Sequence, residues 1–311
     1  MKVRILGSAA GGGFPQWNCN APLSRSVREG RPGFRARTQS SIAASADGRD
    51  WVLFNASPDI RQQIAATPEL HPRADGPLRH SPIRAVVLTN ADVDHIAGLL
   101  SLRESEPFAL YASERVLATL RDNSIFGVLR ADVVDRRPLP LEGRLELAGP
   151  DGAPLGLSVE TFPVPGKVAL FLENEAAADF GTAPGDTMGL SLTNGTGDEN
   201  PLVYVPGCAS VPPTLRKRLE EAACLLFDGT VFHDTEMADS GVGTKTGARM
   251  GHMAIAGEQG SLEALSGIGA ARKIYVHINT TNPILDPGSE AAARVREAGW
   301  EIGFDGMEIS L

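Results

Sequence analysis

The segment TNADVDHIAG places two carboxylates and an imidazole within four residues: Asp92, Asp94 and His95, with Asn90 just before them. As a bare cluster the two carboxylates would repel each other, and a divalent cation is the simplest way to offset that charge. The alternative is a solvated loop in which Asp94 caps the following helix, because Asp is common at helix N-termini. The segment alone therefore suggests a divalent metal site but leaves the capped loop open.

Two further polar side chains end apolar runs. His277 ends KIYVH and Asp228 ends LLFD. Taken alone, a histidine in such a position is more often a buried, hydrogen-bonded residue. An Asp followed by Gly229 is equally well explained as a turn. Both residues become site candidates only if the fold brings these strand ends together.

The apolar runs and turn signals indicate the elements that must do so. We expect strands at 2–8, 40–46, 51–55, 83–88, 108–111, 157–164, 168–173, 188–193, 202–205, 225–227 and 274–277, helices at 57–66, 113–122, 212–223 and 290–298, and a closing hairpin over 300–311. Two strand-rich halves that both carry helices favour an α/β fold, a four-layered αββα sandwich, over a doubly wound parallel sheet. No linker divides the chain, which predicts one domain over residues 1–311.

The amino-acid composition indicates which kinds of molecule the protein can bind. The net charge of −9 comes without any Lys/Arg block, which argues against a nucleic-acid or anionic membrane surface. No stretch approaches the roughly 18 apolar residues of a membrane span, and no signal-peptide pattern opens the chain. The cysteines Cys19, Cys208 and Cys224 are odd in number and widely spaced, which does not suggest a disulfide framework. We expect a cytoplasmic protein with a small-molecule partner.

The strand, TNADVDH and helix block resembles the HxHxDH signature of the metallo-β-lactamase superfamily, with Asn90 and Asp92 in place of the first two histidines. Further blocks cover nearly the whole chain from residue 6 to about 283: GSAAGGGFPQWNC, RTQSSIA, NASPDIRQQI, YVPGC, LLFDGT, GVGTKTGARMGH and VHINTTNP. Together they are similar to the branch of that superfamily that takes part in pyrroloquinoline quinone (PQQ) biosynthesis.

The resemblance implies metal ligands at His95 and His277, with one or both of Asp92 and Asp94. His252 matches a histidine that lies near the reacting group in the phosphodiesterase and tRNase Z branch, either as a ligand or as a proton donor. Asp228 could orient a ligand or the substrate.

Two expected ligands are lost, because Gly166 and Cys208 stand where the superfamily has a histidine and a bridging aspartate. Asp59 matches an aspartate that braces the metal loop, and Cys208 and Asn90 are expected to lie beside the ligands. The remaining two histidines and one carboxylate suit non-haem iron(II) and dioxygen better than dinuclear zinc hydrolysis.

The resemblance implies an iron-dependent hydroxylase of the tyrosine ring of a glutamate–tyrosine crosslinked PQQ precursor. Iron(II) is the expected metal, and zinc is compatible with the purified protein. A metal-dependent hydrolase and a carrier that moves PQQ towards the periplasm are the alternatives, and the absence of membrane segments weighs against transport. Other PQQ pathway enzymes are expected partners, and a homodimer is left open.

A substrate with several carboxylates needs cationic partners. Lys245 and Arg249 lie in a glycine-rich stretch just before His252 that predicts a mobile lid, although an ordinary surface loop fits equally well. Arg61 is a weaker candidate of the same kind.

The resembling branch usually carries a CxCxxC cluster after QWN. Here only Cys19 remains, with Ala21 and Ser24 at the other two positions. A structural zinc is therefore not expected, and we predict that packing holds the loop.

Overall fold

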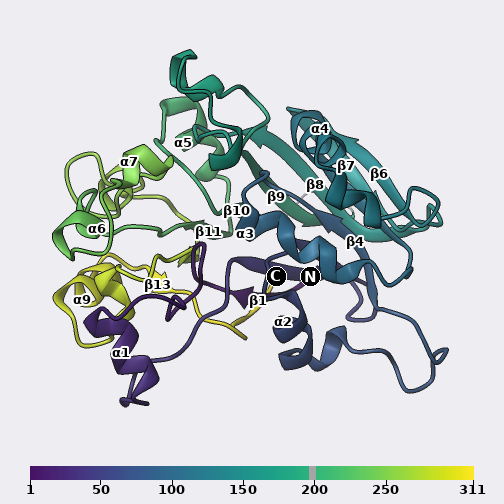
Figure 1. Ribbon diagram of the computed structural model, residues 1–311, viewed down its shortest axis with the longest axis horizontal. Helices are drawn as coiled ribbons and strands as arrows, with labels where there is room; N and C mark the ends of the chain where they lie inside the picture. The colour runs from purple at the N-terminus through teal and green to yellow at the C-terminus, as the bar shows by residue number, and fades with distance from the viewer. Residues whose placement is uncertain (196–200) are drawn as a thin grey trace.

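The computed structural model describes residues 1–195 and 201–311, and two seven-stranded sheets form its body (Figure 1). The first sheet contains, in chain order, β1 (Lys2–Gly7), β2 (Ser41–Ser45), β3 (Trp51–Phe54), β4 (Ile83–Val87), β5 (Phe108–Ser113), β6 (Val134–Leu139) and β14 (Glu308–Ser310), arranged as β14-β1-β2-β3-β4-β5-β6. The second contains β7 (Gly143–Ala148), β8 (Pro154–Pro163), β9 (Met188–Asn194), β10 (Leu202–Val205), β11 (Cys224–Asp228), β12 (Arg272–Val276) and β13 (Glu301–Ile302), arranged as β13-β12-β11-β10-β9-β8-β7.

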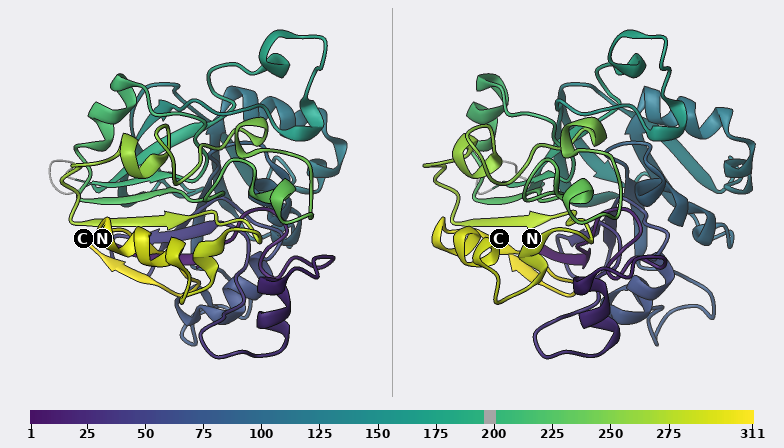
Figure 2. Two further views of the ribbon diagram at one scale, coloured as in Figure 1. Left: turned by 90° about the vertical axis from the view of Figure 1, so that its left-hand side faces the viewer. Right: turned by 60° about the vertical axis from the view of Figure 1, so that its left-hand side comes forward.

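Helices cover the outer faces of both sheets (Figures 1 and 2). In the described residues they are α1 (Pro22–Arg28), α2 (Ile60–Ala66), α3 (Val93–Ile96), α4 (Glu114–Asp122), α5 (Pro213–Leu219), α6 (Glu236–Asp239), α7 (Gly247–Met250), α8 (Ser261–Ala264) and α9 (Glu290–Glu297). Short 3-10 turns lie at Pro68–Leu70, Ala97–Leu102, Ser124–Val128, Leu170–Leu172, Ala178–Gly181 and Pro283–Leu285. None of the helices in this part of the chain is both long and apolar enough to cross a membrane.

Three apolar cores explain why these layers stack. The first core lies between the sheets, where Phe54 and Val87 of one sheet share a cluster with Leu190 and Leu226 of the other. The second core lies between the second sheet and helices that include α5 and α9, and the third between the first sheet and α2, α3 and α4. Each fully buried aliphatic side chain contributes about 1.5–3 kcal/mol to folding. The predicted αββα sandwich is confirmed.

Parallel pairing places the candidate site residues at matching strand ends. Strands β3 to β6 run parallel in the first sheet, and β10 to β13 run parallel in the second. The short helix α3, which holds His95, is the next element after β4, while Asp228 ends β11 and His277 follows β12. A backbone bridge between Asn90 and Thr187 joins the two sheets at this edge. Carboxyl ends of parallel strands are the usual position of α/β sites.

The structure corrects two of the predicted elements. Residues 168–173 form no strand, because β8 pairs directly with β9 and leaves no partner for this apolar stretch, which instead makes a 3-10 turn with exposed Leu170 and Phe171. The C-terminal residues form no hairpin, because β13 pairs with β12 of the second sheet and β14 with β1 of the first. Asp305 lies at the crossing between the sheets and accepts hydrogen bonds from the backbone amides of Ser8 and Thr38.

Smaller differences concern element bounds. The helix predicted from Ser57 begins at Ile60, because the Ser57 hydroxyl accepts a hydrogen bond from the Asp59 amide and forms a turn there. Strands β6 and β7 were not predicted; the sequence of β6, VDRRPL, lacks the apolar run on which the strand predictions rely.

Candidate metal centre

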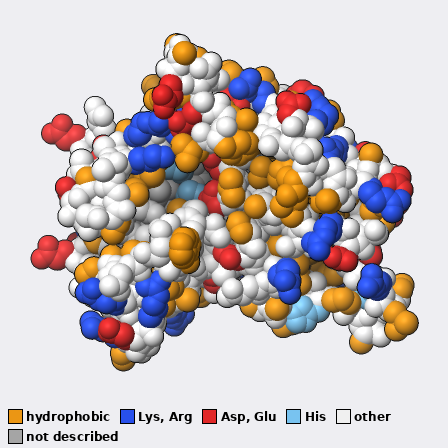
Figure 3. Space-filling view, in the orientation of Figure 1, with side chains coloured by type: hydrophobic (Ala, Val, Ile, Leu, Met, Phe, Trp, Pro, Cys, Tyr) orange, Lys and Arg blue, Asp and Glu red, His pale blue; other side chains and the backbone are white. Residues whose placement is uncertain are grey.

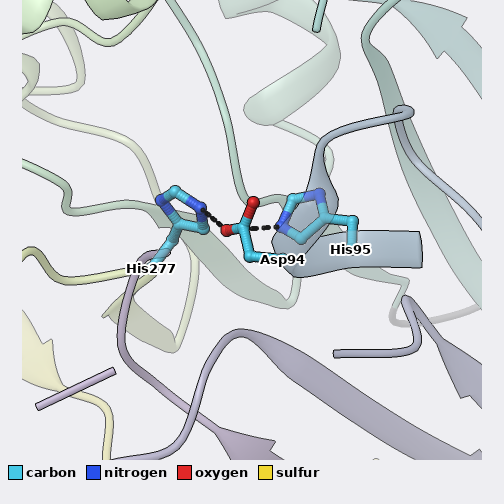
Figure 4. A group of neighbouring side chains, drawn as sticks. All are labelled: Asp94, His95 and His277. Atoms are coloured by element: carbon cyan, nitrogen blue, oxygen red, sulfur yellow. Dashed lines mark hydrogen bonds and ion pairs between the residues drawn. The ribbon is translucent and has the colours of Figure 1, made fainter. Parts of the chain in front are cut away.

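Asp94, His95 and His277 converge between the two sheets, with the Asp94 carboxylate between the two imidazoles (Figure 4). Asp94 Oδ2 lies 3.1 Å from His277 Nε2 and 3.9 Å from His95 Nε2. Both histidines are buried. Burial alone would raise the pKa of Asp94, but His95 and His277 more than offset it and hold that pKa below its usual range. The cluster therefore presents one anionic oxygen between two imidazole nitrogens.

His95 is held in the orientation of a metal ligand. Its Nδ1 lies 2.6 Å from Asn90 Oδ1, and an amide oxygen only accepts, so Nδ1 carries the proton and Nε2 keeps its lone pair. Among the described residues Nε2 has no hydrogen-bond partner although it is buried. Burial lowers the pKa of His95 to about 4, so the ring is neutral at pH 7. A buried, unpartnered lone pair of this kind fits a metal ion.

His277 is oriented by Thr230. The Thr230 hydroxyl donates to Asp228 Oδ1 at 2.6 Å and lies 2.7 Å from His277 Nδ1. Because the hydroxyl has one proton, His277 Nδ1 donates to it and Nε2 is the nitrogen that faces Asp94. Nε2 and Asp94 Oδ2 lie 3.1 Å apart and need a proton or a metal ion between them, and ligand bonds of about 2.0–2.2 Å give similar ligand separations. His277 also has a left-handed backbone, with φ 57°, which is costly for a non-glycine residue and fits a functional position.

His252 and Asp228 form a second charged pair beside this cluster. His252 Nδ1 lies 2.6 Å from Asp228 Oδ2, and the His252 ring stacks on His277 with centroids 5.0 Å apart. Burial would lower the pKa of His252, but the Asp228 carboxylate outweighs burial and raises it. Because Nδ1 is engaged with Asp228, Nε2 is the nitrogen that can exchange a proton or bind a metal. Asp228, His252 and His277 make up a second set of closely spaced donors, so the geometry permits either role for His252.

Asp92 lies near the cluster but belongs to neither set of closely spaced donors found in the described residues. It is the N-cap residue of α3, and its side chain makes no cap hydrogen bond. Burial and the nearby Asp94 charge raise the pKa of Asp92 to about 6. The structure thus favours Asp94 over Asp92 as the carboxylate between the two histidines.

Asp59 braces the neighbouring glycine loop. Its Oδ2 accepts hydrogen bonds from the backbone amide of Gln39 at 2.9 Å and from Gln39 Nε2 at 3.0 Å. Gln39 Oε1 in turn accepts from the Gly12 amide at 2.9 Å. A side chain at the adjacent Gly11 would contact the Asp94 carboxylate at 3.5–3.7 Å. The brace therefore holds the wall beside Asp94.

Cys208 acts through its backbone. Its amide donates to Asp228 Oδ2 at 2.8 Å, while its thiol contacts the Ser210 carbonyl oxygen at 3.1 Å. Burial and the Asp228 charge raise the pKa of the Cys208 thiol, so the thiolate that a metal needs is disfavoured. Cys208 thus supports Asp228 in place of a bridging ligand.

Gly166, where the resemblance led us to expect a histidine, has no room for a side chain. A Cβ there would lie 2.7 Å from Thr187 Cβ and closer still to the Thr187 hydroxyl. Thr187 is buried and bridges to Asn90. Its side chain fills the space into which a residue at 166 would project.

The predicted cationic residues have different surroundings. Arg249 donates to Glu173 through both terminal nitrogens, at 3.1 and 2.7 Å, and Lys167 contacts the same carboxylate. Lys245 is half-buried in the loop between α6 and α7, and Arg61 is exposed on α2. Figure 3 shows histidine side chains at the floor of a hollow on this face, with cationic side chains at its rim.

The loop around Cys19 is fixed by hydrogen bonds as well as packing. Arg28 donates to the carbonyl oxygens of Cys19 and Gln16. Ser24 and Thr280 share a hydroxyl contact of 3.2 Å, which ties α1 to the loop after His277.

Sequence reasoning did not single out Thr230, Lys167 or Glu173. Thr230 directly follows Asp228-Gly229 at the end of β11, and that position beside a candidate Asp was the available signal. Lys167 and Glu173 offered none, because their pairing with Arg249 spans 82 and 76 residues.

The fold and site define a class. The sequence profile of the beta-lactamase superfamily domain matches residues 50–278, and this fold with its Asp and His cluster indicates a metal-dependent enzyme of the metallo-β-lactamase type. A diphosphatase of the PhnP family shares the fold, with a TM-score of 0.67 and 20% identity over 99% of this chain and 96% of that one.

Two relatives are much more similar. Coenzyme PQQ synthesis protein B of Methylobacterium radiotolerans is 51% identical over 312 residues, which cover 100% of both chains. The crystal structure of Zn(2+)-bound PqqB from Methylobacterium extorquens matches with a TM-score of 0.94 and 50% identity over 100% of both chains. The chain belongs to the coenzyme PQQ synthesis protein B (PqqB) family, and its role lies in PQQ biosynthesis.

Proposed function

We propose that the chain is an iron-dependent hydroxylase that acts on the tyrosine ring of a glutamate–tyrosine crosslinked PQQ precursor. The observation that carries the proposal is the donor set of two histidines and one carboxylate, Asp94, His95 and His277. Beside it, the side chain of Thr187 fills the space at Gly166, and Cys208 holds Asp228 through its amide. Such a set leaves coordination positions open and suits iron(II). Bound there, iron(II) would supply the activation of dioxygen.

Other residues of the chain orient the ligands and transfer protons. Asn90 and Thr230 orient the two ligand rings through their Nδ1 atoms. Asp228 holds His252 Nδ1, so His252 Nε2 is the atom we assign to proton transfer with the substrate. The Asp228 carboxylate raises the pKa of His252, which favours the proton-carrying form of the ring.

Carboxylates of the substrate need cations at the rim. Arg249 is the best placed of the predicted residues, because it lines a hollow beside Gly251, the residue that precedes His252. Lys245 and Arg61 remain weaker candidates. Dioxygen as co-substrate, a cytoplasmic location and exchange of intermediates with other PQQ pathway enzymes belong to the same proposal.

Anaerobic loading with iron(II), followed by exposure to dioxygen and mass analysis of the product, tests the proposal. We expect oxygen consumption and a gain of oxygen atoms on the tyrosine-derived ring. Ester or peptide turnover by the zinc-loaded protein, without oxygen uptake by the iron-loaded one, would show a hydrolase. Tight PQQ binding that needs no metal and survives His95→Ala would show a carrier.

A further inference from the structure

Lys167 and Arg249 converge on a single carboxylate, that of Glu173. Arg249 binds it as a fork, with Nη2 2.7 Å from Oε2 and Nη1 3.1 Å from Oε1, and Lys167 Nζ contacts Oε1. The Glu173 side chain is only 7% exposed. A two-pronged guanidinium contact with an added ammonium is a strong way for a protein to recognise a carboxylate. These two cations form a clamp, which we call the carboxylate clamp.

The segment that supplies Glu173 is loosely built. Residues 170–181 contain only 3-10 turns, and in Figures 1 and 2 this part of the chain projects from the body. Asp179 and Phe180 have left-handed backbones, with φ 49° and 55°, which is costly for non-glycine residues. Leu170 and Phe171 are about half exposed, at 56% and 47%. A segment with exposed apolar side chains and strained backbone lies at the low-stability end of a fold.

The clamp opens into a cavity that reaches Gly251, the residue before His252. Lys167, Arg249 and Phe180 line a cavity of about 580 Å³ together with Gly166 and Gly251. The centroid of the Phe180 ring lies 4.1 Å from the Arg249 guanidinium carbon and 5.8 Å from Lys167 Nζ, so the ring covers the clamp from the projecting segment.

Two neighbouring segments join the clamp to the residues around the donor cluster. Gly251, which directly precedes His252, packs so closely on Lys167 that a Cβ at this position would lie 2.8 Å from Lys167 Cβ. The Lys167 carbonyl oxygen accepts from the hydroxyl of Thr187, which bridges to Asn90. A molecule with one group at the metal could therefore place a second group in the clamp.

We propose that Lys167 and Arg249 form the subsite for a carboxylate of the substrate and that Glu173 is an internal occupant which the incoming carboxylate displaces. The exchange leaves the charge at the clamp unchanged, because one carboxylate leaves as another enters. Glu173 then acts as a tethered competitor whose effective concentration sets how much ligand is needed. The proposal rests on the proposed function only in requiring that the substrate carries carboxylates.

Glutarate, with its uncharged diamide as the matched control ligand, tests the clamp by calorimetric titration of the zinc-loaded protein under anaerobic conditions. We expect Glu173→Gln to bind glutarate about tenfold tighter or more than the unsubstituted protein, since the competitor has lost its charge. Glu175→Gln removes an exposed carboxylate of the same segment that acts on Arg249 through its charge alone, and should change glutarate affinity by no more than about two- to threefold. The diamide should bind none of these proteins.

A double variant, Glu173→Gln with Arg249→Gln, separates the clamp from the metal. We expect it to lose the gain in glutarate affinity, whereas binding that survives would place the carboxylate elsewhere and overturn the proposal. The proposal is also wrong if a folded Glu173→Gln protein binds glutarate no tighter than the unsubstituted one.

Hydrogen exchange supplies a test that needs no substitution. In the unsubstituted protein, glutarate should speed amide exchange across residues 170–181 as Glu173 leaves the clamp, and unchanged exchange at saturating glutarate would count against displacement. Both measurements follow binding alone, so their result stands whichever reaction the metal centre performs.

Discussion

Thr230 Oγ1 lies 2.7 Å from His277 Nδ1, and this contact decides which nitrogen of His277 faces Asp94. The same hydroxyl donates to Asp228, so one side chain orders both donor sets of the site. Side chains that orient ligand histidines typically account for 10–100-fold in metal affinity.

The Thr230 contact leads to a first prediction. Thr230→Val keeps the size of the side chain but removes the hydroxyl, and we expect zinc(II) affinity to fall about 10–100-fold. Thr230→Ser retains the hydroxyl and should bind zinc(II) within a few-fold of the unsubstituted protein. Competition against a chelating indicator measures both. Equal affinities for the Val and Ser variants would show that Thr230 does not orient His277.

His95 should couple metal binding to stability, because its buried Nε2 is unpartnered among the described residues. A ligand at 100 times its Kd stabilises the folded state by about 2.7 kcal/mol, which raises Tm by about 4 °C in a chain of this size. We expect this shift when zinc(II) is added to metal-stripped protein, and its loss in His95→Ala. His71→Ala, which changes an exposed histidine, should keep the full shift. An undiminished shift in His95→Ala would remove His95 from the ligand set.

The role of His252 can be separated from metal binding. If His252 Nε2 transfers protons, His252→Gln and Asp228→Asn should lower turnover by about 10²–10⁴-fold while each chain still binds its metal. Metal analysis and turnover, measured on the same samples, make the distinction. Loss of one equivalent of metal in His252→Gln would instead identify His252 as a ligand.

Glu236 lies away from the metal ligands, and we expect its titration to make the stability of the protein depend on pH. Burial raises the pKa of Glu236 to about 7, although its carboxylate accepts hydrogen bonds from Thr281 Oγ1 and the Phe232 amide. The pKa of Glu236 is therefore higher in the folded protein than in the unfolded protein. Protonated Glu236 stabilises the folded state fully below about pH 4.5, and this stabilisation is lost as the pH rises through about 7.

The substitution Glu236→Gln removes this titration. Relative to the unsubstituted protein, the free energy of unfolding of the variant should rise by roughly 2 kcal/mol between pH 5 and pH 8. Urea unfolding at several pH values measures the difference, and Glu263→Gln, which changes a carboxylate nearer the surface, should show no such trend. Parallel pH profiles for the Glu236→Gln variant and the unsubstituted protein would contradict the assignment.

The confirmed predictions of the fold rest on local runs of apolar residues in the sequence. The αββα layers follow from such runs, and the strand ends after β4, β11 and β12 bring His95, Asp228 and His277 to one edge. The stretch at 168–173 misled for the same reason, because its apolar residues Leu170, Phe171 and Leu172 are exposed on a projecting segment and pair with no strand. Contacts between distant residues left no local signal.

Thr230 and Glu173 show why contacts between distant residues could not be predicted from the sequence. Thr230 meets His277 across 47 residues and Glu173 meets Arg249 across 76, and each contact depends on the direction of a single side chain. Periodicity reports which face of an element is buried, but not which hydroxyl or carboxylate reaches a given partner.

Gly166 allows a direct test of whether the packing at this position limits the number of metal ions that the site binds. Gly166→His restores the residue type that the superfamily has at this position, yet its Cβ would lie 2.7 Å from Thr187 Cβ. We expect overpacking to lower the free energy of unfolding by about 1–3 kcal/mol without adding a metal equivalent. Gly166→His combined with Thr187→Gly frees that space and should recover part of the lost stability. Urea unfolding and metal analysis of both variants measure these effects. A second metal equivalent in the single variant would show that Thr187 yields and that the missing histidine alone, rather than the packing around it, keeps a second ion out.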